Sequence, residues 1–157
     1  GVKLRLLAVG QKMPGWVQSG YNEYARRMPP HLALELVEIA PGRRGRNADV
    51  TRAMQSERDT ILSHSPAGHR AIALDVRGKP WSTEALASNL ADWMQDGRNV
   101  DLLIGGPDGL HPDCLARAER RWSLGPLTLP HPLVRIVLAE QLYRAWTILD
   151  GHPYHRA

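Results

Sequence analysis

The chain has 157 residues, of which 43% are hydrophobic and 23% charged. This length predicts one domain over residues 1–157, and the composition excludes a disordered chain. The single cysteine, Cys114, excludes an intramolecular disulfide framework and is typical of a reducing compartment. Because no apolar run has the length of a membrane span and the N-terminal residues lack a signal-peptide pattern, we expect a cytoplasmic protein. The net charge of +4 fits a polyanionic partner without identifying one.

Short runs rich in Val, Ile and Leu alternate with longer segments of helical periodicity, which is typical of βαβ units and a parallel sheet. The first half predicts a strand (4–9), a helix (17–28) ended by Pro29-Pro30, a strand (34–39), an arginine-containing loop (41–47) and a helix (50–64) capped by Asn47 or Asp49. The second half predicts a strand (71–76), a break at Gly78-Lys79-Pro80, a helix between Ser82 and Gly97, a strand (100–104), a helix (112–121), a strand (122–124) and a helix (132–149). The fold class is therefore α/β.

The final helix is apolar on more than one stripe. Such a helix on a small domain lies between two layers or meets a second subunit, and we favour an isologous dimer through it. The residues concerned are Leu133, Val134, Ile136, Val137, Leu138, Leu142, Trp146 and Leu149.

Three strand ends are the first places to look for a ligand, because parallel sheets bind ligands at the carboxyl ends of their strands. The segments are Leu74-Asp75, residues 103–109 and residues 123–132. The second carries glycines at 105, 106 and 109, which permit close approach of the backbone to a ligand, although a tight turn explains them equally. The pattern matches neither a dinucleotide-binding fingerprint nor a P-loop.

A neutral shelf for adenine and ribose fits these segments better than a phosphate cradle. Pro107 and Pro126 stiffen the loops, and Leu124, Leu127 and Leu129 supply apolar walls. The alternative for residues 124–129 is an ordinary apolar connection.

The C-terminal tail and one loop carry the remaining candidate groups. Residues 152–156 contain two imidazoles, a phenol and a guanidinium, which suit stacking on a base and binding phosphate, unless the terminus is frayed. Arg43, Arg44 and Arg46 form either a phosphate-binding surface or a solvated loop.

Other chemistries have little support. No histidine or cysteine pair has zinc-ligand spacing, so we expect no metal, and no nucleophile triad indicates hydrolysis. Asp75 either caps a turn or acts chemically, and Glu140 can pair with Arg144 four residues later.

Several motifs together resemble the RlmH family of SPOUT-class methyltransferases, which act on a pseudouridine of bacterial large-subunit ribosomal RNA. The resemblance covers essentially the whole chain. The motifs are LLAVGQKMPGWV, GRRGRNAD, LDVRGKPW, LLIGGPDGL, WSLGPLTLPHPLVRIVLAEQLYRAW and HPYHR.

This resemblance implies a homodimeric α/β domain whose C-terminal segment threads a loop to form a trefoil knot, an exception to the rule that chains do not thread. It also implies that the knotted loops bind S-adenosylmethionine. The matching positions are Leu74, Gly105, Leu124, Gly125, Pro126, Leu127, Thr128 and Leu129.

The implied reaction is methylation of N3 of a pseudouridine in 23S rRNA of the assembled ribosome. Arg144 would favour the anionic base, and Tyr154 and His155, reaching across from a partner subunit, would position the base or relay its proton. Two alternatives remain: a noncatalytic ribosome-associated factor that binds rRNA through its basic surface, and a flavodoxin-like nucleotide-binding enzyme.

Overall fold

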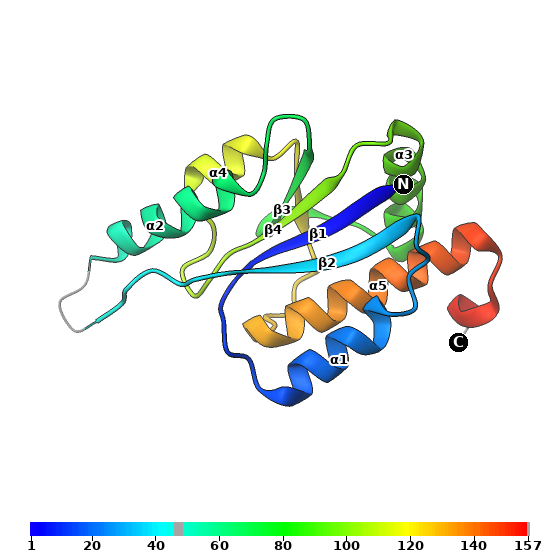
Figure 1. Cartoon of the computed structure of the whole chain (residues 1–157), viewed down its shortest axis with the longest axis horizontal. Coiled ribbons are helices and arrows are strands. Elements are labelled where there is room, and N and C mark those ends of the chain that lie inside the picture. Colours follow the sequence, from blue (N-terminus) through cyan, green and yellow to red (C-terminus); the bar gives the residue numbers. More distant parts are fainter. Residues whose placement is uncertain (46–48, 157) are drawn as a thin grey trace.

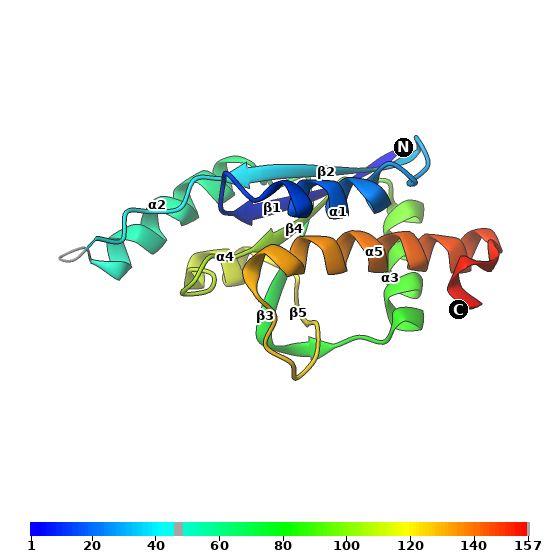
Figure 2. The same cartoon turned by 90° about the horizontal axis from the view of Figure 1, so that it is seen from below.

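The structure, a computed structural model, describes residues 1–45 and 49–156. One sheet of parallel strands has the order β2-β1-β4-β3-β5 and lies between helices on both faces (Figures 1 and 2). The strands are β1 (Val2–Val9), β2 (Leu32–Ile39), β3 (Arg70–Pro80), β4 (Val100–Ile104) and β5 (Arg120–Ser123). The helices are α1 (Gly15–Ala25), α2 (Val50–Ser63), α3 (Thr83–Asp96), α4 (Pro112–Arg117), α5 (His131–Asp150) and the 3-10 turn η1 (Pro153–Arg156). The expected α/β class is confirmed.

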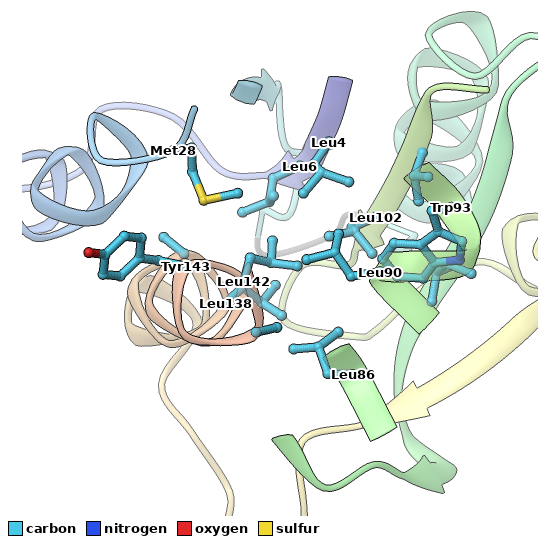
Figure 3. Close-up of a cluster of buried hydrophobic side chains, with 14 of the residues drawn as sticks. Leu4, Leu6, Met28, Leu86, Leu90, Trp93, Leu102, Leu138, Leu142 and Tyr143 are labelled. Carbon is cyan, nitrogen blue, oxygen red and sulfur yellow. The ribbon is translucent and has the colours of Figure 1, made fainter. Parts of the chain in front are cut away.

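The alternation of side chains along the strands divides the core into two clusters. Leu4 and Leu6 of β1 pack with α1, α3 and α5, whereas Leu7 packs on the opposite face with α2 and α4. Figure 3 shows Leu138 and Leu142 of α5 pointing into the larger cluster, toward the side chains of β1, β4 and α3. The helix α5 is therefore anchored in the main core.

Two predicted helix starts and one predicted end are confirmed. Asp49 accepts a hydrogen bond from the amide of Thr51 at 2.9 Å, and Ser82 accepts one from the amide of Ala85 at 3.0 Å. Gly97 ends α3 in the left-handed region, at φ 85°. Asn47, the alternative cap of α2, lies outside the described residues.

Two predicted helices were too long. α1 ends at Ala25, three residues before the predicted end at Met28, and a turn leads to the prolines. α4 ends at Arg117 instead of residue 121, because Ala118 is extended and the amide of Glu119 donates to the carbonyl of Ala71. The chain thus joins the sheet earlier than predicted, and β5 begins at residue 120 instead of 122.

The predicted break at Gly78-Lys79-Pro80 was wrong. β3 continues to Pro80, with both Leu74 and Lys79 aligned with Trp122 of β5, so residues 75–78 bulge out of the ladder. An added Cβ at Gly78 would lie 2.6 Å from the Arg121 carbonyl carbon. The glycine therefore permits close strand approach, and the bulge displaces Asp75 from the ladder.

Many of the apolar side chains of α5 are buried within a single chain. The helix packs against α1 and α3 as well as the sheet, and Leu138, Ala139, Leu142 and Ala145 are fully buried. Leu133 and Val137 remain half-exposed. No helix within residues 1–45 and 49–156 is long and apolar enough to cross a membrane.

Replacing Leu142 with Ala will test the anchoring of α5. We expect the free energy of unfolding to fall by about 2–5 kcal/mol, because a fully buried leucine leaves a cavity. Leu149→Ala on the same helix is the matched control: its side chain is 42% exposed, so the loss should stay below about 0.5 kcal/mol. Urea denaturation of both variants measures the difference, and equal losses would contradict the assignment.

Candidate functional site

The three strand-end segments meet around one cavity of about 540 Å³. The bulge of β3, the turn after β4 and the connection from β5 to α5 form its walls. Its lining residues are Leu74, Asp75, Val76, Ile104, Gly105, Gly106, Pro107, Asp108, Gly109, Trp122, Ser123, Leu124, Gly125, Leu127, Leu129, His131 and Val134. The expectation that the segments converge is confirmed.

Six of the eight positions expected to bind a cofactor line this cavity: Leu74, Gly105, Leu124, Gly125, Leu127 and Leu129. Pro126 and Thr128 belong to the same connection but are not among the lining residues. The side chain of Leu127 is 78% exposed. The cavity is consequently open to solvent on the side of this connection, and an occupant would cover Leu127.

Glycine is required where the turn after β4 folds on itself. A Cβ added at Gly105 would lie 2.4 Å from the carbonyl carbon of Gly109, a distance that the backbone would have to relieve by moving. Gly109 itself has φ 78° and Gly125 has φ 120°, both in the region that favours glycine. The turn after β4 therefore presents backbone to the cavity at its three glycines, whereas the other walls carry apolar side chains.

Few polar side chains face the cavity, and most of them hold the loops in place. Asp75 accepts a hydrogen bond from the amide of Arg77 at 3.2 Å, which is the turn-capping role left open by the sequence. Ser123 Oγ accepts one from the amide of Gly125 at 3.1 Å. His131 bonds the carbonyl of Val9, which ties the first turn of α5 to β1.

The tail is an ordered 3-10 turn that folds back on α5. The Tyr154 hydroxyl donates to Glu140 Oε2 at 2.7 Å, and Arg144 Nη2 donates to the same oxygen at 2.7 Å. The Arg144 guanidinium also lies 4.9 Å from the centre of the Tyr154 ring. The predicted pairing of Glu140 with Arg144 is confirmed, and it extends to Tyr154.

These contacts set the charge of each group. Burial and the hydrogen bond to Glu140 raise the pKa of Tyr154 above its usual range, so the phenol stays neutral. Burial favours the protonated form of Glu140, but the hydrogen bonds from Arg144 and Tyr154 outweigh it and lower the pKa of this carboxyl. At neutral pH the cluster holds a carboxylate, a guanidinium and a neutral phenol.

Within one chain the tail is not among the residues that line the cavity. His131 and Val134, in the first turn of α5, line the cavity, whereas Tyr154 follows the last turn of this 20-residue helix. A helix of that length spans about 30 Å, although the tail folds back along it as far as Glu140, six residues after Val134. Figure 2 shows the tail beyond the end of α5 that points away from the β5–α5 connection. Arg144, Tyr154 and His155 are therefore not brought to the cavity of their own chain.

The three loop arginines have different environments. Arg43 is exposed, whereas Arg44 forms ion pairs with Glu57 and Asp108. Arg46 lies outside the described residues. The sequence shows three equivalent cations, but the structure leaves only Arg43, among those it describes, without such pairs.

Two residues that line the cavity and one contact of the tail were not predicted from the sequence. Trp122 and Val134 line the cavity from β5 and α5, although both look like ordinary core residues in the sequence. The sequence spacing indicates Arg144 as a partner of Glu140 but does not indicate Tyr154, because that contact requires the tail to fold back on α5. Among the described residues no three His, Cys, Asp or Glu side chains are arranged to hold a metal ion.

Comparison with known proteins shows which family this chain belongs to. The model of the predicted SPOUT methyltransferases matches residues 2–155. Relatives called ribosomal RNA large subunit methyltransferase H are 58% identical over 155 residues in Pseudomonas putida F1, 60% over 156 in Alkalilimnicola ehrlichii and 62% over 155 in Chromohalobacter salexigens. Each alignment covers 99% of this chain and 100% of the relative.

Two solved structures share the fold at low sequence identity. A putative methyltransferase from Legionella pneumophila, in complex with the bound cofactor SAM, is 13% identical with a TM-score of 0.51, over 92% of this chain and 66% of that one. TrmJ from Z. mobilis ZM4 is 18% identical with a TM-score of 0.52, over 93% and 70%. The chain therefore belongs to the SPOUT methyltransferases and, within them, to the family of ribosomal RNA large subunit methyltransferase H.

Proposed function

We propose that this chain uses S-adenosylmethionine to methylate N3 of a pseudouridine in 23S rRNA of the assembled ribosome. It would act in the cytoplasm as one domain over residues 1–157. The observation that carries the proposal is the meeting of three glycine-rich or apolar strand ends around one cavity. Family membership supports methyl transfer, and the names of the relatives support large-subunit rRNA as the substrate.

The cavity fits a nucleoside cofactor. Its volume of about 540 Å³ lies within the range of about 300–1,000 Å³ that is usual for small-molecule sites. Leu74, Leu124 and Leu129 offer apolar contact to an adenine, while the backbone of residues 105–109 and 123–125 offers amide and carbonyl groups to the ribose and the amino acid portion. Pro126 and Thr128 would shape the connection from outside the lining, and Leu127 would close over the occupant.

When bound, S-adenosylmethionine supplies an electrophilic methyl group and leaves as S-adenosylhomocysteine. The chain's own contribution is alignment and charge. Holding two reactants in line at attack distance lowers a barrier by about 7–11 kcal/mol. The imide nitrogen must lose its proton to attack, and Arg144 would stabilise the resulting negative charge. Tyr154 and His155 would position the base.

The position of the tail supports a dimer in which each site combines two chains. An isologous interface that packs α5 antiparallel to its two-fold copy brings the last turn of one α5 to the first turn of the other. The half-exposed Leu133 and Val137 supply apolar contact for such packing. Arg144, Tyr154 and His155 would then reach the partner's cavity.

A trefoil knot is part of the same proposal. β5 pairs with β3 at the edge of the sheet, yet α5, which follows it, returns across the sheet to pack against α1. The connection between them lies against the turn after β4 and the bulge of β3 around the cavity. If the C-terminal segment threads a loop of the β3–β4 region along this path, the three walls of the cavity would be held in fixed positions relative to one another.

The RNA would meet the basic loop outside the cavity. Arg43 is exposed and free to contact phosphate, and we assign to Arg46 the same role. Phosphate contacts of this kind make binding strongly dependent on salt. A noncatalytic rRNA-binding factor would use the same surface, but it requires no cavity with glycine-lined walls.

Replacing Gly105 with Ala will test the cofactor site. The added Cβ forces the turn apart, so we expect affinity for S-adenosylmethionine to fall about tenfold or more, in line with typical overpacking costs of about 1–3 kcal/mol. Gly68→Ala is the control, because a Cβ there meets nothing within 4 Å. Calorimetry measures the affinity, and mass spectrometry of treated ribosomal RNA detects the methylated pseudouridine. No cofactor binding by the unaltered chain would favour the noncatalytic factor.

Mixed dimers will test the shared site. Arg144→Ala and Gly105→Ala each impair both sites of a homodimer at a cofactor concentration below the dissociation constant of Gly105→Ala, whereas a mixed dimer keeps one intact site if the tail serves the partner's cavity. Co-expression of the two variants should restore about a quarter of the unaltered activity, because about half of the dimers are mixed. Mixtures that remain inactive would place tail and cavity in the same chain.

The Glu140 cluster predicts a pH-dependent stability. Because the folded-state pKa of Glu140 lies below its usual 4.5, ionised Glu140 stabilises the fold above that pH, and the contribution is lost as the pH falls through the folded-state value. Glu140→Gln should therefore lower the free energy of unfolding by about 1 kcal/mol at about pH 7 and by less at about pH 4. Urea unfolding at both pH values checks this, and a difference independent of pH would contradict it.

A further inference from the structure

A buried carboxylate on α2 organises the loop that follows β2. Glu57 is only 3% exposed. Arg44 Nη1 donates to its Oε2 at 2.5 Å and Arg44 Nη2 to its Oε1 at 3.2 Å, while the amide of Gly42 donates to Oε2 at 2.9 Å. The buried carboxylate of Glu57 is thus paired with a guanidinium and a backbone amide of the loop, as a buried charge requires.

The same guanidinium reaches the cavity wall. Arg44 Nε donates to Asp108 Oδ2 at 2.8 Å, and Asp108 lies in the turn after β4 that lines the cavity. The turn also lies close to both β1 and α2: a Cβ added at Gly106 would lie 2.9 Å from Val9 Cγ1 and 3.7 Å from Glu57 Oε1. Arg44 therefore connects a buried anchor, Glu57, to a residue of the cavity wall, Asp108.

The geometry leaves Arg44 little capacity for another anion. Its Nε and both of its terminal nitrogens already donate to carboxylates, and the side chain is only 20% exposed. The hydrogen bond to Glu57 raises the pKa of Arg44 further, so its charge is permanent. Binding a phosphate would remove the compensation of a buried carboxylate, which is costly.

We propose that Arg44 is a positioning residue that fixes the wall of residues 105–109 in the shape that binds the cofactor, in place of the phosphate contact expected from the sequence. This inference rests on the proposed function, because it concerns the same cavity. It predicts that Arg44 affects cofactor affinity when no RNA is present.

Asp108→Asn is the most direct test, because it weakens the link to the wall and leaves the pair between Arg44 and buried Glu57 intact. We expect the dissociation constant for S-adenosylmethionine, measured by calorimetry without RNA, to rise about 3- to 10-fold, as for loss of one charge-assisted hydrogen bond. Asp108→Glu keeps the carboxylate and should restore most of the affinity. Arg52→Ala removes an exposed cation from α2 and should leave the affinity unchanged.

A double-mutant cycle separates this role from direct contact between Asp108 and the cofactor. If Asp108 acts through Arg44, the double variant Arg44→Ala/Asp108→Asn binds the cofactor no more weakly than Arg44→Ala alone. Additive losses, or an unchanged dissociation constant in Asp108→Asn, would overturn the proposal. Circular dichroism and thermal unfolding of each variant report folding independently. Failure of the unaltered chain to bind the cofactor would instead overturn the proposed function.

Discussion

Close approach of backbone segments at the carboxyl edge of the sheet is the constraint on which the cavity depends. The parallel pairing of β3 with β4 and with β5 brings the bulge of β3, the turn after β4 and the connection from β5 to α5 to one place around the cavity. Gly105 lies so close to Gly109, and Gly78 to Arg121, that a Cβ at either glycine would clash with backbone. The cavity between these segments therefore combines glycine backbone with apolar side chains such as Leu74, Leu124 and Leu129, which suits a ligand recognised both by apolar contact and by hydrogen bonds to amides and carbonyls.

One helix connects this edge to the rest of the molecule. The first turn of α5 contributes Val134 to the cavity, its middle contributes Leu138 and Leu142 to the core, and its last turns hold Arg144 beside the tail. Because Leu138 and Leu142 are fully buried between the sheet and α3, both ends of the helix are held in a fixed relation. Core packing thus determines the spacing between the cavity walls and the tail.

Local signals in the sequence identified most of the fold and the three cavity walls. Asp49, Ser82 and Gly97 act at the positions where capping chemistry places them, because capping depends on neighbouring residues only. The bulge of β3 was not predicted, because Gly78 and Pro80 normally end a strand. In the structure β3 resumes its pairing with β5 at Lys79 and Pro80, and the sequence of this segment alone does not indicate that pairing. The three loop arginines were indistinguishable for the same reason: the partner of Arg44 is a glutamate 13 residues later, buried by tertiary packing.

The charge state of the tail narrows the roles it can have in the chemistry. A phenol whose pKa is raised stays neutral, and its proton is already donated to an ionised Glu140, so Tyr154 is poorly suited to accept the imide proton. Its ring is instead held against the Arg144 guanidinium and the ring of Tyr143, which gives it a defined orientation. The cluster therefore presents a rigid aromatic surface beside a guanidinium whose charge is already paired with the Glu140 carboxylate. To stabilise an anionic imide in the proposed reaction, Arg144 would have to use its remaining nitrogen, Nη1, because Nε and Nη2 donate to Glu140, and a group other than Tyr154 would have to accept the imide proton.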